Sequence, residues 1–369
     1  MTGGLIVLFG IIAMVMLHEA GHFLAAKAVG MKATEFFFGF GPRLWSTRRG
    51  ETEYGIKAIP LGGYVRIVGM NPYEEVDPAD VGRTYRDQPF RAKAVVVLAG
   101  VTSHFVVAFL LFFVVASLLG VSESTTTVES VQAALDDGTP SPASAVDIRS
   151  GDRIVSIDGV EPAGWSEAVD MIMGSPGETI EIVLDRGGTL LTVRPTLASV
   201  DDGDGGERGY LGVRSASITV RAGPIEGLGD AGAAVGEATV ASATGLWRMV
   251  SGFGGLVEAV ITGDADKINE TRPASPIGLV RIGAETQELG IGFTLELIAL
   301  VNVFVGLFNV IPIYPLDGGH FAVALYEKVR GRPADVRKLA PIVAVVVTFM
   351  VLLGVLAIYL DIASPFSLR

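Results

Sequence analysis

Two histidines and a glutamate lie close together near the start of the chain, in the stretch VMLHEAGHFLAAK of residues 15 to 27. His18 and His22 are four positions apart, so on a helix their rings lie on one face, one turn apart, and can reach the same ion, with Glu19 beside them. The chain has no cysteine, so any metal must be held by His, Asp or Glu. The pattern predicts a metal site; the alternative is a pair of buried polar residues that neighbouring helices satisfy.

Two histidines do not complete a catalytic zinc site, which usually has three protein ligands and an open position for water. The stretch NVIPIYPLDGGHF, residues 309 to 321, contains a single acid, Asp317, among prolines and glycines that break a helix and allow close backbone approach. We expect Asp317 to be the third ligand, although an acidic cap in a loop is the alternative. Bound zinc lowers the pKa of water to about 7, and Glu19 is then expected to accept the proton of that water.

The elements that must position these residues are strongly apolar. The composition is 50% hydrophobic and only 18% charged, with a mean hydropathy of +0.50, which favours a multi-spanning membrane protein over a soluble one. Apolar runs at residues 3 to 26, 94 to 120, 289 to 311 and 339 to 360 are each long enough to cross about 30 Å of hydrocarbon. The first run has no basic residue before it, so it is expected to be a retained span and not a signal peptide.

Basic residues predict how the spans are oriented. They cluster after the first span and between the third and the fourth, so these two loops are expected to be cytoplasmic. The N-terminus, residues 121 to 288 and the C-terminus would then lie outside. Residues 121 to 221 hold 17 Asp and Glu against 7 Arg and no Lys. Such an acidic segment is not expected to bind nucleic acid.

Three further elements follow from periodicity. The alternation in ETEYGIKAIPLGGYVRI, residues 51 to 67, predicts strands. In the acidic segment we expect a strand at residues 153 to 157, a helix around 166 to 173, and a hairpin closed by Gly187 and Gly188. Apolar residues at three- and four-residue steps within 223 to 263 predict an amphipathic helix lying on the outer membrane surface. Packing support for the acidic module is the alternative role for that helix.

The two motifs together, His18-Glu19-x-x-His22 and Asn309-x-x-Pro312-x-x-x-Leu316-Asp317-Gly318-Gly319, resemble those of the site-2 protease family of intramembrane zinc metalloproteases. The resemblance extends over nearly the whole chain and fits the bacterial branch with four spans and one PDZ domain. GFGP at 39 to 42 and PLGGYV at 60 to 65 resemble that family's membrane-associated β segment, and residues 142 to 159 resemble a PDZ domain.

The resemblance implies a polytopic α-helical membrane protein in the bacterial inner (plasma) membrane. It would hold one Zn²⁺ per chain on His18, His22 and Asp317, with Glu19 as the catalytic residue and the active site toward the cytoplasm. It further implies that Asn309 holds the substrate backbone, with a helix-packing hydrogen bond as the alternative role. Gly62 and Gly63 would belong to a hairpin whose edge receives an extended substrate, and as the alternative these glycines serve only as turn residues.

The implied substrates are single-span membrane proteins, such as anti-sigma factors, and leftover signal peptides. The PDZ domain would bind a peptide or a carboxy-terminal ligand, or serve only as a protective cap. The rival function is a non-catalytic membrane scaffold that gathers partners through its PDZ domain. The intact set His18, Glu19, His22 and Asp317 favours the enzyme, because a scaffold has no use for Glu19.

The expected organisation has seven parts: a first transmembrane helix with the zinc motif (1–29), a cytoplasmic-side membrane-associated β segment and loop (30–90), a second transmembrane helix (91–120), an extracytoplasmic PDZ-like α/β domain (121–220), an extracytoplasmic amphipathic helix and linker (221–288), a third transmembrane helix with the third zinc ligand (289–327), and a cytoplasmic loop, fourth transmembrane helix and external tail (328–369).

The chain departs from the family pattern in the second span and in the PDZ-like segment. Val101 and His104 stand where the family often has Pro and Asn, and Asp147 stands where Gly is common. His104 is expected to be a packed, hydrogen-bonded histidine, with orientation of substrate or contact with the metal site as alternatives. For His320 two alternatives stand: a similar role near the metal site, or a surface or supporting position.

Overall fold

The computed structural model describes residues 2–71, 74–135, 137–201, 206–262, 273–286 and 290–363. It divides into two compact units, Met1–Leu119 together with Ala222–Arg369, and Gly120–Arg221. We call the first the helical unit and the second the acidic unit. The expected external tail at 364–369 and part of the expected linker, 263–272, lie outside the described residues.

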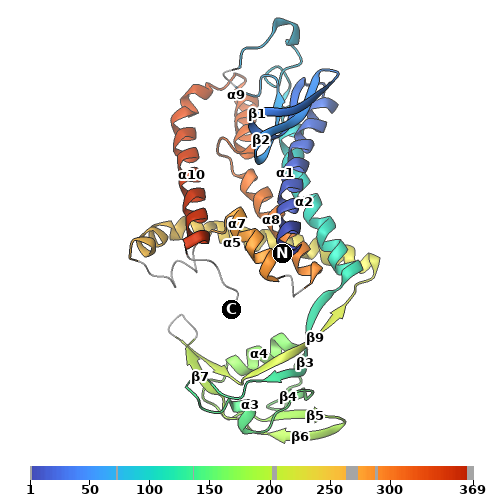
Figure 1. Cartoon of the computed structure of the whole chain (residues 1–369), viewed down its shortest axis with the longest axis vertical. Coiled ribbons are helices and arrows are strands. Elements are labelled where there is room, and N and C mark those ends of the chain that lie inside the picture. The colour runs from blue at the N-terminus through green and yellow to red at the C-terminus, as the bar shows by residue number, and fades with distance from the viewer. Residues whose placement is uncertain are drawn as a thin grey trace. The chain divides into compact units, whose positions relative to one another are not determined.

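Four helices of the helical unit are long and apolar enough to cross a membrane, as the sequence predicts. They are α1 (Thr2–Ala28), α2 (Phe90–Val114, continued to Leu119 by the π-helical turn Val115–Leu119), α8 (Ile291–Val310) and α10 (Ala340–Ala363). α1 packs against α2, and α2 packs against α8 (Figure 1). Large apolar side chains such as Phe9, Leu24 and Val345 point outward, as expected for helices that face lipid.

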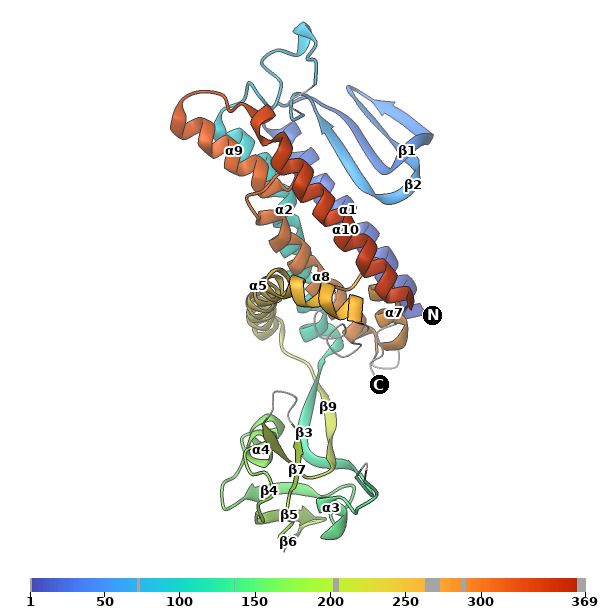
Figure 2. The ribbon, with the colours of Figure 1, turned by 90° about the vertical axis from the view of Figure 1, so that its left-hand side faces the viewer.

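Two further helices lie across this bundle. α5 (Pro224–Thr262) runs crosswise to α1 and α10 at the end where α1 begins, and α7 (Pro276–Glu285) packs on α1 at the same end (Figures 1 and 2). α5 fills the expected range of 223 to 263, and small residues in its first half, such as Ala231 and Ala238, are buried. α7 is not predicted from the sequence; Ser275 caps it by accepting hydrogen bonds from the N–H groups of Ile277 and Gly278.

Two long strands, β1 (Ala33–Arg49) and β2 (Thr52–Ile67), form an antiparallel sheet at the opposite end of the bundle (Figure 2). Both strands bend back, so residues 35–38 of β1 pair with 63–66 of β2 on one side and with 53–56 of β2 on the other. Residues 43–49 of β1 pair in turn with 52–57 of β2. The segments therefore alternate across the sheet, and residues 63–66 form one of its edges.

The remaining elements of the helical unit lie at the same end of the bundle as this sheet (Figures 1 and 2). They are the 3₁₀ turns Pro78–Asp80 and Val336–Leu339 and the helix α9 (Asp317–Arg330). Buried residues of α1, β1, β2 and α2, including Ala26, Ala33, Ile67 and Val96, form a hydrophobic cluster here. This cluster fixes the sheet against the ends of α1 and α2.

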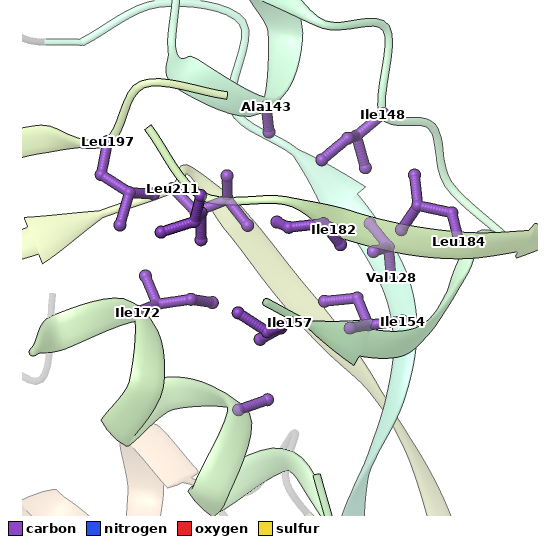
Figure 3. Packing of buried hydrophobic residues seen from close by; sticks show 12 residues of the cluster. Val128, Ala143, Ile148, Ile154, Ile157, Ile172, Ile182, Leu184, Leu197 and Leu211 are labelled. Carbon is purple, nitrogen blue, oxygen red and sulfur yellow. The ribbon is translucent and has the colours of Figure 1, made fainter. Parts of the chain in front are cut away.

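The acidic unit has a five-stranded sheet in the order β6-β5-β4-β3-β9 and a separate β7-β8 pair. Its elements are β3 (Val121–Val131), α3 (Pro142–Ala145), β4 (Arg153–Ile157), α4 (Trp165–Met173), β5 (Ile182–Arg186), β6 (Thr189–Val193), β7 (Ala198–Asp201), β8 (Glu207–Tyr210) and β9 (Val213–Val220). The expected strand, helix and hairpin are present. Ile154, Ile157, Ile182 and Leu184 point into one apolar core with Ile172 of α4 (Figure 3).

Asp147 of this unit has φ +59°, a left-handed conformation that Gly adopts without strain and that Asp tolerates better than most residues. The Gly that the family often has at this position therefore suits the backbone. Arg149 and Arg186 pair with the Asp147 carboxylate.

Candidate zinc site at the first apolar helix

Three of the residues that the sequence singles out converge at one point. His18 and His22 project from one face of α1, and Asp317 is the first residue of α9. The Nε2 atoms of His18 and His22 are 3.1 Å apart, and Asp317 Oδ2 lies 3.4 Å from the first and 3.2 Å from the second. Among the described residues these side chains form a group whose candidate ligand atoms all lie within 4.8 Å of one another.

These distances fit a zinc ion. Ligand atoms around a tetrahedral ion with bonds of 2.0–2.1 Å lie about 3.3 Å apart. The His22 Nδ1–H donates to the carbonyl of Val96 at 2.8 Å, so its Nε2 presents a lone pair to the other two residues. This lone pair and the Asp317 carboxylate repel one another unless a cation lies between them. A bond from the remote nitrogen to a carbonyl is also typical of metal-binding histidines.

Close packing of α1 and α2 holds His22 in place. Its side chain is only 4% exposed, and its ring lies directly against Gly100 of α2. A Cβ added at Gly100 would lie 2.2 Å from His22 Nε2. The glycine is therefore required for the ring to occupy this position.

Glu19 is held by the sheet. Its Oε2 accepts a hydrogen bond from the backbone N–H of Val65 at 3.0 Å. Gly63 lies beside it, because an added Cβ there would come within 3.5 Å of Glu19 Cγ and within 2.7 Å of Met16 Sδ. Gly62 has φ +114° and faces Val15 of α1. The edge of β2 that carries both glycines therefore lies against the face of α1 that carries Glu19.

Asp317 reaches the site because the chain turns sharply between α8 and α9. A Cβ at Gly318 would lie 2.1 Å from the carbonyl oxygen of Val310 and 2.4 Å from that of Ile311, so only Gly fits. Asp317 itself occupies the first turn of α9, where the helix dipole favours a negative charge.

A model of the family described as Peptidase family M50 matches residues 6–353. The chain belongs to peptidase family M50. It is 32% identical over 402 residues to zinc metalloprotease Rip1 of Mycobacterium tuberculosis, an alignment that covers 100% of this chain and 98% of that protein. It is 33% identical to Rip1 of Mycolicibacterium smegmatis over 98% of each chain. A putative zinc metalloprotease of Nostoc sp. is 29% identical, with 87% of this chain and 85% of that protein covered.

Among solved structures, the PDZ domain of an SdrC-like protein from Listeria innocua is similar at 24% identity. The match covers 25% of this chain and 92% of that domain, with a TM-score of 0.21. The family model and these relatives show that the protein is a zinc metalloprotease of the site-2 type, with zinc as its cofactor. Its four apolar helices are those of a multi-pass membrane protein.

The other residues singled out in this M50 chain have different surroundings. Asn309 is half-buried in the last turn of α8, and its side chain has no hydrogen bond to a described residue. The ring of His320 lies 4.3 Å from that of Tyr314 at a tilt of 53°, its Nδ1 lies 3.0 Å from the Tyr314 hydroxyl, and Tyr85 meets it edge-on. His104 lies against His18, with ring centroids 4.8 Å apart.

Sequence reasoning missed the partners that fix these side chains. The sequence does not predict that Glu19 is held by Val65, His22 by Val96 and His104 by Asn302. The first two act through backbone atoms, so no residue type signals them. Asn302 had a signal, because it is an amide within the apolar run of α8, where polar residues are costly.

Proposed function

We propose that the chain is an intramembrane zinc metalloprotease that hydrolyses peptide bonds within the transmembrane segments of single-span substrates, such as anti-sigma factors or signal-peptide remnants. The observation that carries this is the convergence of His18, His22 and Asp317 within a helix apolar enough to span a membrane. One Zn²⁺ per chain would be held by these three residues. The expected bacterial inner-membrane location, with external termini and a site toward the cytoplasm, is part of the proposal.

The division of roles follows from the contacts. Bound zinc would supply a water of lowered pKa as nucleophile. Glu19, anchored through Oε2 at Val65, would accept the proton of the attacking water and return it to the amine nitrogen of the departing chain. The side chain of Asn309, with no partner among the described residues, would hold the substrate backbone.

A substrate helix must be unwound to expose its amide, and the edge of β2 offers a way to bind it extended. Residues 63–66 pair with β1 on one side only, and on the other side Val65 N–H points to Glu19. An extended segment added to this edge at Gly62 and Gly63 would pass beside Glu19. A cavity of about 1140 Å³, lined by apolar residues of α1, α5 and α8 such as Met14 and Phe304, offers room for the adjoining apolar part of the substrate.

The acidic unit would serve as an extracytoplasmic PDZ-like module that binds a peptide or a carboxy-terminal ligand. Its antiparallel sheet with the helix α4, and its own apolar core, support this role. The second candidate is a non-catalytic scaffold that uses this module. Such a scaffold would not need the anchored carboxylate of Glu19, whereas the protease would.

The test is Glu19→Gln, which keeps the size of the side chain and its ability to accept from Val65. We expect purified wild type to contain one zinc per chain and to cut a single-span reporter in detergent. Glu19→Gln should retain zinc and lose cleavage by about 10²–10⁴-fold. In cells, the variant should accumulate single-span fragments in the membrane proteome. A zinc-free wild type or an active Glu19→Gln protein would overturn the proposal in favour of the scaffold.

A further inference from the structure

His104 of α2 is a buried histidine with one satisfied nitrogen. It is 2% exposed, and its Nδ1 lies 3.3 Å from Oδ1 of Asn302 on α8, a residue that is fully buried. The Nδ2 of Asn302 donates to the carbonyl of Ile298 at 2.9 Å, which leaves Oδ1 as the acceptor. The hydrogen therefore belongs to Nδ1 of His104, and Nε2 carries a lone pair.

That lone pair has no partner. His104 Nε2 is fully buried and makes no hydrogen bond among the described residues. Buried polar atoms are normally paired, and an unpaired one calls for an explanation. A histidine kept only for packing between α2 and α8 would be complete with the Asn302 bond, so packing does not account for Nε2.

The surroundings of His104 indicate where the missing donor comes from. Its ring lies over that of His18, with centroids 4.8 Å apart and planes 33° apart. Gly306 of α8 backs it, because a Cβ there would lie 2.9 Å from His104 Cβ. His104 is not a member of the group formed by His18, His22 and Asp317, so it lies beside that group and not within it.

We propose that His104 is a further active-site residue whose Nε2 accepts a hydrogen bond from a donor at the reaction centre. This inference rests on the proposed function. Two groups could donate this hydrogen bond. One is the second O–H of the water at the zinc site, whose first proton Glu19 would accept, and the other is the backbone N–H of the bound substrate. Asn302 is then a positioning residue that sets the tautomer and the direction of the ring.

The experiment uses the full-length protein in detergent with His104→Leu, which keeps the bulk and removes both nitrogens, and His104→Gln, whose amide oxygen can reach the position of Nε2. Thr294→Val is the matched control, because Thr294 is a buried polar residue of α8 outside the site. We expect His104→Leu to fold and to keep its zinc while turnover falls about tenfold or more, with partial recovery in His104→Gln and no change in Thr294→Val.

Two further readouts do not depend on turnover. Nitrogen NMR of the metal-free protein should show His104 as the tautomer protonated at Nδ1, and Asn302→Ala should lose that preference. In the Co²⁺-substituted protein without substrate, a spectrum changed by His104→Leu assigns the donor to bound water. An unchanged spectrum with a raised KM assigns it to the substrate N–H.

Turnover of His104→Leu within twofold of wild type would overturn the inference, as would a loss of zinc in proportion to the loss of activity. An inactive wild type would instead defeat the proposed function. If His104→Leu has normal turnover while Glu19→Gln is inactive, only this inference fails and the proposed function stands.

Discussion

The acidic unit and the helical unit distribute polar and apolar side chains in opposite ways. In the acidic unit, Ile182 and Leu184 are completely buried, and the one almost completely buried carboxylate that the structure describes there, Asp152, is paired with Arg186. In the helical unit, Phe9 and Leu24 face outward, while His22, His104 and Asn302 are almost completely buried. The first arrangement is what water imposes on a soluble domain, and the second is what lipid permits.

The difference teaches which substitutions each unit tolerates. Removal of apolar atoms from water stabilises the acidic unit, so loss of core volume should destabilise it. Lipid tails are as apolar as the side chains between the helices, so burying apolar side chains there stabilises the bundle little. The helical unit therefore depends on close contact between small residues and on its polar interior. Added volume and lost polar groups should therefore be the damaging changes in that unit.

The largest expected effect is at Asp317. Asp317→Ala removes one of three converging donors, so zinc affinity should fall by more than about 100-fold and cleavage should be lost. The damage should be confined to the metal site, because Asp317 would serve that site, while the contacts of α1 with α2 and of α2 with α8 that hold the bundle do not involve it. Mass spectrometry measures the zinc content, and circular dichroism in detergent measures the helix content. Asp230→Ala, at an exposed acid of α5, is the control, and full zinc content in Asp317→Ala would contradict the assignment.

The next effect is in the acidic unit. Ile182→Ala leaves a cavity in the core of the sheet and should lower the free energy of unfolding of this unit by about 2–5 kcal/mol. Pulse proteolysis of the full-length protein, read at cuts within residues 120–221, gives that value. Leu190→Ala, at a side chain that is 66% exposed, should change it little, and zinc content should be unaffected in both. Equal costs for the two variants would refute the contrast between the units.

Added volume tests the helical unit. Gly100→Ala places a methyl group 2.2 Å from His22 Nε2, so we expect zinc affinity and turnover to fall about tenfold, or by about 1.4 kcal/mol. Gly354→Ala in α10 adds the same methyl group where no atom lies within 4 Å, and it should behave as wild type. Metal titration and reporter cleavage compare the pair. Similar behaviour of the two variants would show that close helix contact does not position His22.

The smallest effect concerns charged pairs at the surface, whose contribution to stability should be the same in the two units. Hydrogen bonds from Arg83 and Lys27 lower the pKa of Glu51 from its ordinary 4.5 to about 2. Because the folded pKa is the lower one, this contribution to stability is present above about pH 4.5 and is lost as the pH falls toward 2. Glu51→Gln should therefore lower the free energy of unfolding by no more than about 1 kcal/mol at pH 7 and by nothing near pH 2.

Thermal unfolding at several pH values measures this difference. Glu181→Gln, in the exposed pair with Arg194 of the acidic unit, is the matched variant. A several-fold larger effect at Glu51 would mean that the contrast between the units extends to their surfaces.

Local geometry accounts for what could be predicted from the sequence. The placement of His18 and His22 on one face requires only the helical repeat, and the strand and helix of the acidic unit follow from their own periodicity. The juxtaposition of Asp317 with them was expected from its chemistry, since it is the one acid among helix-breaking residues. Four apolar helices follow from length and composition alone.

What could not be predicted depends on contacts between distant segments. The anchor of Glu19 exists only because β2 lies against α1, and a backbone N–H leaves no mark in the sequence. The role of Gly100 appears only when α1 and α2 are in contact. The helix α7 is not predicted, because its ten residues are short and its contact with α1 lies far away in the sequence.

The alternating order of segments in the β1–β2 sheet has a mechanical consequence. Residues 35–38 are paired on both sides with β2, so they cannot be pulled away without loading residues 63–66 and 53–56. Tension applied at the edge of residues 63–66 is shared with residues 35–38 and, through them, with 53–56. A polypeptide drawn along that edge would therefore pull against the whole sheet and not against a single strand, and the sheet can resist while a helix is unwound beside it.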